Sequence, residues 1–409
     1  MKTCIALMSL YLLSGAVRAE DTEIEAKRVA ILALGDLDDA PAIHDAVEFE
    51  STANMRAIYF DALPWKSKPT RVFAWLGMPK TIQAGKKVPG MVLVHGGGGT
   101  AFKEWVQKWN DEGFAAISIA VEGQTDIQGP GGDGQFWKRH EHGGPPRVGI
   151  FGDLNEPIVD QWMYHAVADT ALANSLLRSL PEVDKDRVGL MGISWGGIIT
   201  STVIGIDTRF AFAIPTYGCG DLHLAENQYE TSLNPPKNPG YVDYWNPSLR
   251  ASRAKMPVLW LTWLRDSHFP LTVQSSSYRA AAGSRMVAVL PDMGHSHPAG
   301  WNPRESYEFA KSIVGFGTAW ATPIETKVDK TDARAQFTCK RPVKGAVLFH
   351  TTDGGYTADR KWEQSPAKMQ TEGDRILVTA SVPARTTACF FNFESDGLTV
   401  SSDFVELAR

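Results

Sequence analysis

The stretch Val188-Gly189-Leu190-Met191-Gly192-Ile193-Ser194-Trp195-Gly196-Gly197-Ile198-Ile199 carries the pattern Gly-x-Ser-x-Gly between two apolar runs. The residues before the pattern predict a strand and those after it predict a helix, so Ser194 is expected on a sharp turn between the two. Glycines two positions on either side of the serine avoid clashes between the strand and the helix. This arrangement makes Ser194 the candidate nucleophile.

A glycine-rich segment upstream fits the same arrangement. The apolar run from Pro89 to Val94 predicts a strand, and it ends in His95-Gly96-Gly97-Gly98-Gly99. Glycines expose their backbone N–H groups and let the chain approach a substrate closely. Serine hydrolases with such a turn place one oxyanion donor in a loop of this kind and the other on the residue after the nucleophile. We therefore expect Gly97, Gly98 and Trp195 to form an oxyanion hole.

An acid and a base follow the serine in the order that this arrangement requires. Asp266 lies in the loop after the apolar run from Pro257 to Trp263, and His295 follows the run from Met286 to Leu290. The order along the chain in an α/β-hydrolase is Ser, then Asp or Glu, then His. We expect Asp266 and His295 to complete the site, and we prefer His295 over His297 as the base.

These residue types predict hydrolysis through an acyl-enzyme. Neutral His295 would accept the proton of Ser194 as the hydroxyl attacks an ester carbonyl, and Asp266 would fix the ring tautomer and stabilise the imidazolium. Backbone donors would hold the tetrahedral oxyanion, and water would then release the acyl group. This chemistry uses neither a metal nor another cofactor, so none is expected.

Two His-x-His pairs, His140-Glu141-His142 and His295-Ser296-His297, raise the question of a zinc site. Alternate residues of an extended chain face the same side, so both histidines of a pair could ligate one ion. Neither pair continues into a recognisable metal-site pattern, and the proposed base accounts for one of them. We therefore expect no metal at either pair.

Candidate substrate contacts lie in two further segments. The loop from Gly129 to Val148 is rich in glycine and proline and contains Arg139, which could contact a polar group of a substrate. The insertion from Asp221 to Lys255 contains Trp245 and several tyrosines, and such rings either stack on sugars or pack the interior of a cap. We take Arg139, Trp245 and His297 as candidate substrate-binding residues, with packing left open as the alternative for the aromatic rings.

The start of the chain and its charge bear on compartment and partners. Lys2, an apolar run from Cys4 to Leu13 and small residues up to Ala19 predict a signal peptide over residues 1–19. The mature protein is therefore expected to be secreted or periplasmic. A formal net charge of −5 argues against nucleic acid as a partner. No later segment is apolar over enough residues to predict a membrane span, and the oligomeric state is left open.

The length of 409 residues predicts two domains after the signal peptide. Residues 20–322 alternate strand-like and helix-like stretches, which predicts an α/β-hydrolase with a doubly wound, mostly parallel sheet and a cap-like insertion at about 221–255. Residues 323–409 contain only strand-like segments, which predicts a small β-sandwich after a linker at 321–325. The expected strands cover residues 71–76, 91–94, 115–120, 188–191, 210–214, 258–263 and 286–290 of the first domain and residues 345–350, 375–382 and 389–393 of the second.

Three cysteines remain after the signal peptide. Cys339 and Cys389 both lie in the expected sandwich, where the oxidising conditions outside the cytoplasm would permit a bridge, and the sequence leaves this bridge open. Cys219 is expected to pack as a small buried residue, since no histidine follows it in an order that would make it a nucleophile.

At family level, the chain resembles bacterial secreted α/β-hydrolases related to acetylxylan esterases and dienelactone hydrolases. The resemblance spans most of residues 50–320 and implies Ser194, Asp266 and His295 as a catalytic triad. Dienelactone hydrolases use a cysteine nucleophile where this chain has a serine, which favours ordinary ester hydrolysis. The motifs that carry the resemblance are His95 to Thr100, Trp137 to Glu141, Gly143 to Pro146, Gly192 to Gly197, Tyr217 to Gly220 and His295 to His297.

The leading function hypothesis is a secreted serine carboxylesterase for short acyl esters, with acetylated polysaccharide such as xylan as a candidate substrate. A serine peptidase of prolyl-oligopeptidase-like type shares the turn and the residue order, but such peptidases usually carry a large N-terminal propeller, and the segment before the first expected strand has no room for one. A third hypothesis is a surface binding protein that has lost the chemistry. The presence of all three triad residue types argues against it.

Overall fold

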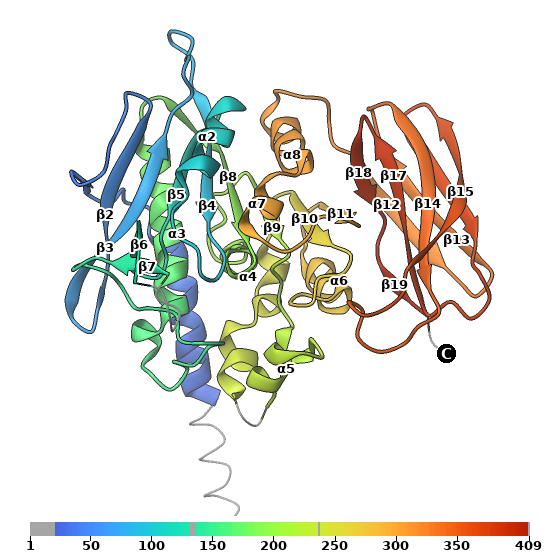
Figure 1. Cartoon of the computed structure of the whole chain (residues 1–409), viewed down its shortest axis with the longest axis horizontal. Coiled ribbons are helices and arrows are strands. Elements are labelled where there is room, and N and C mark those ends of the chain that lie inside the picture. The colour runs from blue at the N-terminus through green and yellow to red at the C-terminus, as the bar shows by residue number, and fades with distance from the viewer. Residues whose placement is uncertain (1–20, 131–135, 236–237, 408–409) are drawn as a thin grey trace, which may run out of the picture.

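A computed structural model describes residues 21–130, 136–235 and 238–407 of the chain (Figure 1). The expected signal peptide over residues 1–19 lies outside the described residues. Among the described residues, no helix combines the length and the apolar character that a membrane crossing requires.

The centre of the molecule is a twisted, mostly parallel sheet, which confirms the expected α/β-hydrolase fold. Its strand order is β1-β2-β3-β5-β4-β8-β9-β10-β11, and the six strands from β5 to β11 in this order run parallel. The first three strands are antiparallel to their neighbours. The strands are β1 (Ile43–Asp45), β2 (Met55–Trp65), β3 (Lys68–Gly77), β4 (Val88–Val94), β5 (Ala115–Ile119), β8 (Val183–Ile193), β9 (Phe212–Thr216), β10 (Val258–Trp263) and β11 (Arg285–Leu290).

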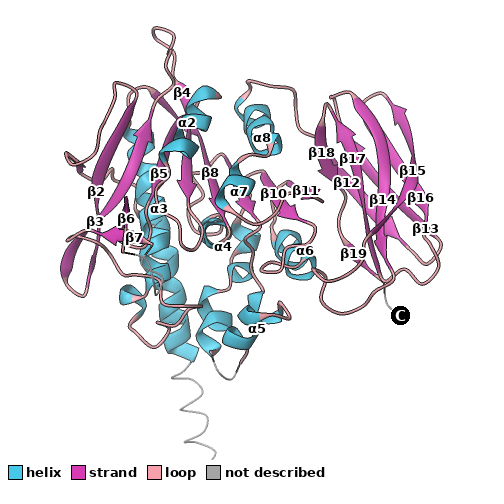
Figure 2. Ribbon diagram, viewed as in Figure 1, coloured by secondary structure: helices cyan, strands magenta, loops and turns pink. Residues whose placement is uncertain are grey.

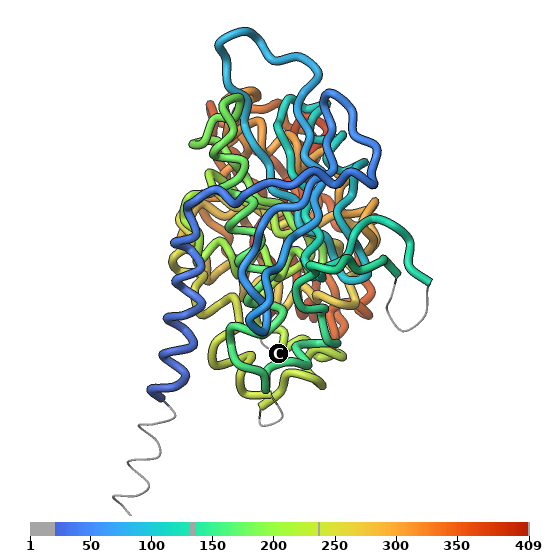
Figure 3. Tube along the Cα trace, turned by 90° about the vertical axis from the view of Figure 1, so that its left-hand side faces the viewer, coloured from blue at the N-terminus to red at the C-terminus, as the bar shows by residue number. Residues whose placement is uncertain are grey.

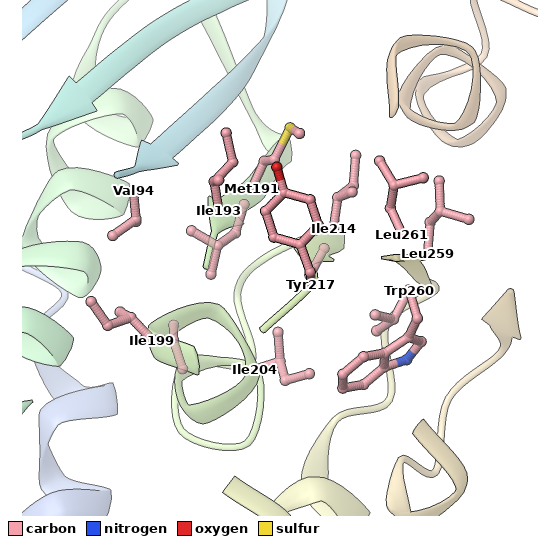
Figure 4. Close-up of a cluster of buried hydrophobic side chains, with 14 of the residues drawn as sticks. Val94, Met191, Ile193, Ile199, Ile204, Ile214, Tyr217, Leu259, Trp260 and Leu261 are labelled. Carbon is pink, nitrogen blue, oxygen red and sulfur yellow. The ribbon is translucent and has the colours of Figure 1, made fainter. Parts of the chain in front are cut away.

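Helices cover both faces of this sheet. Helices α2 (Lys103–Asp111) and α8 (Arg304–Val314) pack on one face, while α3 (Trp162–Ser179) and α4 (Trp195–Val203) pack on the other. Residues 21–32 form a further helix along one side of the molecule, which is clearest in Figure 3. Strands that are covered on both faces must be apolar throughout, and β4 and β9 accordingly bury nearly every side chain. Strand β8 does the same from Val188 to its end, whereas residues 184–187 at its start are exposed or half-buried. Figure 4 shows part of the resulting core around β8, β9 and β10.

The insertion expected at about 221–255 is a compact group of short helices below the sheet in Figure 1. Its aromatic side chains are buried, so the structure supports a role for these rings in packing the insertion and not in stacking on a sugar. The short helices are η3 (Leu222–Leu224), α5 (Gln228–Leu233), η4 (Tyr241–Trp245), η5 (Pro247–Leu249) and η6 (Ala251–Arg253), and α6 (Leu271–Ala280) follows β10.

The C-terminal part is built of strands, as Figure 2 shows on its right-hand side. One sheet has the order β12-β13-β16-β15 and the other β15-β14-β17-β18, so β15 contributes to both. The short strand β19 also pairs with β17. The strands are β12 (Thr322–Val328), β13 (Asp332–Thr338), β14 (Val343–Thr351), β15 (Glu363–Glu372), β16 (Arg375–Ser381), β17 (Ala388–Ser395), β18 (Leu398–Ser401) and β19 (Val405–Glu406).

The sandwich is joined directly to the central sheet. Strand β18 pairs antiparallel with β11, with Val287 opposite Ser401. The Val289 N–H donates to Ser401 Oγ at 2.8 Å, and Asn392 Nδ2 donates to the Val289 carbonyl at 2.9 Å. The sandwich therefore continues the hydrolase sheet instead of hanging from a flexible tether.

Several local expectations differ from the structure. The residues expected as a linker, 321–325, include the start of β12. Strand β9 begins and ends two residues later than expected, because the chain first turns at Thr208 and Arg209. Cys219, Cys339 and Cys389 are all free and buried, and the Cys339 Sγ lies 3.3 Å from Ser395 Oγ, so the bridge left open by the sequence is not formed.

Candidate active site

Ser194 sits on a strained turn between β8 and α4. Its φ of +58° and ψ of −114° are rare for a residue with a side chain. The Ser194 N–H donates to the Thr216 carbonyl at 3.0 Å, which anchors the turn to β9. A Cβ atom on Gly192 would lie 2.0 Å from the Gly196 carbonyl oxygen, and one on Gly196 would lie 2.0 Å from the Val94 oxygen. Both glycines are therefore required for this turn to pass between the strands.

The structure brings Ser194, His295 and Asp266 into one chain of hydrogen bonds. Ser194 Oγ lies 3.0 Å from His295 Nε2, and Asp266 Oδ2 lies 2.7 Å from His295 Nδ1. A carboxylate can only accept, so Nδ1 carries the proton and Nε2 is left free to accept one from the serine. Asp266 is buried, and its Oδ1 accepts from the N–H groups of His268 and Phe269 at 2.8 and 2.9 Å.

The aromatic ring of Tyr217 holds His295 from one side. The two rings are stacked with centroids 4.4 Å apart, and the Tyr217 hydroxyl donates to the Ser296 carbonyl at 2.7 Å. Tyr217 adopts a φ of +38°, so it belongs to a second turn constrained by its surroundings. The exposed ring of His268 also lies near His295, with centroids 4.7 Å apart and the two rings tilted by 51°. Neither residue is among the sequence-based candidates.

The glycine loop lies directly against the serine turn. A Cβ atom on Gly96 would be 3.0 Å from the Ser194 Cβ, and one on Gly97 would be 2.9 Å from the Trp195 ring. Within the described residues, the N–H groups of Gly97 and Gly98 donate to no acceptor. The Trp195 N–H opens helix α4, which has no side-chain cap, so it is also unpaired. Three backbone donors are thus unpaired in the glycine loop and the serine turn, which lie against each other.

His297 fixes this loop instead of pointing at a substrate. Its Nε2 accepts a hydrogen bond from the Gly96 N–H at 2.9 Å, and its ring lies 4.8 Å from that of Phe102. Burial lowers the pKa of His297 to about 4, and the nearby His95 adds to this shift. The ring is therefore neutral near pH 7 and able to accept. The sequence placed His297 at the site, but as a substrate contact.

Arg147 lies against the same loop and was not predicted. Its guanidinium is 4.8 Å from the centre of the Trp195 ring, its Nε pairs with Glu122 at 3.1 Å, and its Nη1 donates to the Gly149 carbonyl at 2.8 Å. A Cβ atom on Gly97 would be 3.2 Å from Arg147 Nη2. Burial raises the pKa of the Glu122 carboxyl, although Arg147 opposes this shift. An arginine in an irregular loop gives no pattern from which its position could be inferred.

The structure places two of the candidate substrate contacts in other roles. Trp245 is 1% exposed, and its Nε1 donates to Gln161 Oε1 at 2.6 Å, so the ring is enclosed in the insertion and cannot stack on a sugar. Both terminal nitrogens of Arg139 donate to backbone carbonyls, those of Glu122 and Gly144, so this guanidinium braces its own loop.

The loop that carries Asp266 is held by both neighbouring parts of the chain. Asn227 Nδ2, from the insertion, donates to the carbonyls of Ser267 and His268 at 2.9 and 3.0 Å. The Tyr356 hydroxyl, from the sandwich, donates to the same Ser267 carbonyl. The Leu271 N–H donates to the Thr357 Oγ1 at 3.0 Å. The position of the candidate acid therefore depends on residues far away in the sequence.

Neither His-x-His pair forms a metal site in the structure. His142 contacts the carboxylate of the adjacent Glu141 at 3.2 Å, while the His140 ring packs 4.8 Å from that of Tyr59. Across residues 21–130, 136–235 and 238–407, no group of three or more His, Cys, Asp or Glu side chains is arranged to hold an ion.

This fold and this cluster of side chains define a hydrolase of the α/β serine-hydrolase superfamily. Comparisons with known proteins agree with that class. Residues 38–219 match the acetyl xylan esterase family model, and residues 153–322 match the prolyl oligopeptidase family model. The chain is therefore related to both groups, and the serine turn lies in the segment that the two models share.

Solved structures with this fold include two acetyl xylan esterases. Acetyl xylan esterase 1 from a Thermoanaerobacterium species superposes with a TM-score of 0.55 and 22% identity, covering 71% of this chain and 93% of that one. The acetyl xylan esterase from a Paenibacillus species gives a TM-score of 0.50 and 20% identity, covering 68% and 89%. Such identities establish a common fold and nothing finer.

Among curated proteins, dipeptidyl-peptidase 5 of Porphyromonas gingivalis is 27% identical over 168 residues. The match covers 39% of this chain but only 21% of that peptidase. It concerns a part of the peptidase, so it relates this chain to a segment of a much longer protein.

Proposed function

We propose that the protein is an exported serine carboxylesterase that removes short acyl groups, acetyl above all, from a polysaccharide such as acetylated xylan. The observation that carries the proposal is the hydrogen-bonded series Asp266, His295 and Ser194 beside the free N–H groups of Gly97, Gly98 and Trp195. The predicted signal peptide and the match to the acetyl xylan esterase model support the compartment and the substrate class.

In this mechanism, Ser194 Oγ attacks the ester carbonyl carbon while His295 Nε2 takes its proton. Asp266 holds the ring with Nδ1 protonated and stabilises the imidazolium that forms. The oxyanion accepts hydrogen bonds from the free backbone donors, each of which contributes about 3 kcal/mol to lowering the barrier. His295 then protonates the departing alcohol oxygen and activates water to cleave the acyl-enzyme.

A serine peptidase is the second candidate, because residues 153–322 match the prolyl oligopeptidase model. The same three side chains would serve, but the leaving group would be an amine. The two proposals differ in what binds beside the serine, so substrates must decide between them.

The experiment compares wild-type protein with Ser194→Ala on 4-nitrophenyl acetate, acetylated xylan and an aminoacyl 4-nitroanilide. We expect release of acetate from the first two substrates and a loss of at least about a thousandfold in Ser194→Ala, with the fold retained. Faster cleavage of the anilide would favour the peptidase. Unchanged turnover in a folded Ser194→Ala variant would refute the catalytic assignment.

A further inference from the structure

A separate cavity lies where the catalytic loops meet the sandwich. It has a volume of about 540 Å³, which is within the range of roughly 300–1,000 Å³ typical of small-molecule sites. The loops after β10 and β11 form one side, and residues of β14 and β15 with the segment before β15 form the other. No residue of the proposed catalytic series lines it, so this cavity requires its own explanation.

Two tryptophans contribute aromatic surface to the cavity. Trp263 ends β10, and its indole Nε1 donates to the Pro291 carbonyl at 3.0 Å. Trp362 precedes β15 and packs against Phe390 with ring centroids 5.6 Å apart. Both rings line the cavity and both are only half-buried, so each keeps exposed surface for a ligand. An exposed aromatic face suits the C–H face of a sugar ring.

Three polar side chains line the same cavity, namely Arg265, Asp292 and Gln364. All three are exposed, and within the described residues none makes a side-chain hydrogen bond or an ion pair. Nearby arginines behave differently, since Arg279 pairs with Asp403 and Arg360 with Glu406. A guanidinium donates, a carboxylate accepts and an amide does both.

This combination selects a class of ligand. An apolar ligand would leave the arginine, the carboxylate and the amide without partners when it displaced their water. An ion of either sign would meet one like charge, because Arg265 and Asp292 carry opposite charges. A neutral molecule with many hydroxyl groups and one apolar face satisfies all five side chains, and a sugar ring has this chemistry.

The cavity also adjoins the catalytic residues along the chain. Arg265 directly precedes Asp266, and Gly294, which lines the cavity, directly precedes His295. Asp266 is buried and bonded to His295, whereas the exposed Arg265 lines the cavity. We propose that this cavity is a binding subsite for a sugar ring of the polysaccharide whose ester Ser194 cleaves, and the choice of that polysaccharide as ligand rests on the proposed function.

The test uses titration calorimetry to measure the binding of xylohexaose and of mannohexaose to the intact protein. The double variant Asp292→Ala/Gln364→Ala removes two exposed side chains that hold no other part of the protein, so it is expected to fold. The matched control is Gln370→Ala, the same exposed residue type on the same strand β15 but outside this cavity. We expect the wild type and the control to bind at least one hexasaccharide and the double variant to bind it at least about tenfold more weakly.

Kinetics separates this subsite from the esterase proposal. For the double variant, the ratio of kcat/KM on an acetylated oligosaccharide to kcat/KM on 4-nitrophenyl acetate should fall about tenfold, through KM. Failure of both hexasaccharides to bind the wild type, or equal binding by the double variant, would overturn the subsite. Binding that depends on Asp292 and Gln364, in a protein that releases no acetate from any glycan, would keep the sugar subsite and overturn the polysaccharide esterase.

Discussion

Replacing His297 by phenylalanine tests whether the glycine loop must be held in place for catalysis. The loop approaches the ring so closely that a Cβ atom on Gly99 would be 2.5 Å from His297 Nε2. Phenylalanine keeps a ring of similar size against Phe102 but cannot accept the hydrogen bond from the Gly96 N–H. The substitution therefore removes one acceptor with little change in packing.

The expected effect follows from that lost bond. A partly buried donor left without a partner costs about 1–3 kcal/mol, and the loop can escape part of this cost by moving Gly96 toward water. Gly97 and Gly98 move with it, and a lost oxyanion donor costs about 3 kcal/mol of barrier lowering. We expect kcat on 4-nitrophenyl acetate to fall between about tenfold and a hundredfold, which corresponds to roughly 1.4–2.7 kcal/mol.

Steady-state kinetics on His297→Phe and His297→Gln measures this effect, with urea unfolding to compare their stability. The amide oxygen of glutamine can accept from the Gly96 N–H, so His297→Gln should recover part of the lost kcat. The reasoning would be refuted by a stably folded His297→Phe variant with the kcat of wild type. It would also be refuted if the two variants lost activity equally, because the acceptor would then not matter.

Three further outcomes are expected. Asp266→Asn should lower kcat on 4-nitrophenyl acetate by roughly 10⁴-fold, since an amide would hold the base in the wrong tautomer. A decrease in kcat of less than about tenfold would argue against Asp266 as the acid. Tyr356→Phe removes the hydroxyl that holds the Ser267 carbonyl, so kcat should fall severalfold while KM stays constant. The acid limb of the profile of kcat against pH should also shift. If the substitution changed only the stability of the protein, this limb would stay in place. Burial lowers the pKa of His95 from 6.5 to about 4. As the pH falls below 6.5, the unfolded chain therefore takes up a proton on this ring while the folded protein does not. The free energy of unfolding should then decrease until the pH reaches about 4. The pKa of His297 is lowered to about 4 in the same way, so urea unfolding should show a loss of at least about 2 kcal/mol between pH 7 and pH 5. An unchanged free energy of unfolding would contradict the burial of these two rings in their neutral form.

The serine turn could be predicted because its requirements are local. Strand, Gly-x-Ser-x-Gly and helix follow one another within a dozen residues of sequence, and the strain falls on the serine itself. Asp266 and His295 could be predicted because each follows an apolar strand of the parallel sheet. Parallel strands deliver the residues after their carboxyl ends to one edge, so their meeting follows from the fold.

Other elements left little trace in the sequence. All side chains of strand β15 are exposed or half-buried, and the strand contains Pro366, so it shows no apolar run to detect. Composition cannot tell an enclosed Trp245 from an exposed ring, because the difference depends on what packs around it. His297 was placed at the site, but its bond to Gly96 spans 201 positions of sequence and has no local signature.

The pairing of β18 with β11 has a consequence for attempts to shorten the chain. Strand β11 is the last parallel strand, and without the sandwich its outer N–H and C=O groups would face water as an open template for another chain. The buried Val287 and Val289 would be uncovered along the same border. A fragment that ends at Trp320 should therefore self-associate and precipitate during expression. In the full chain, the sandwich covers the edge of the sheet and so prevents aggregation of the catalytic part.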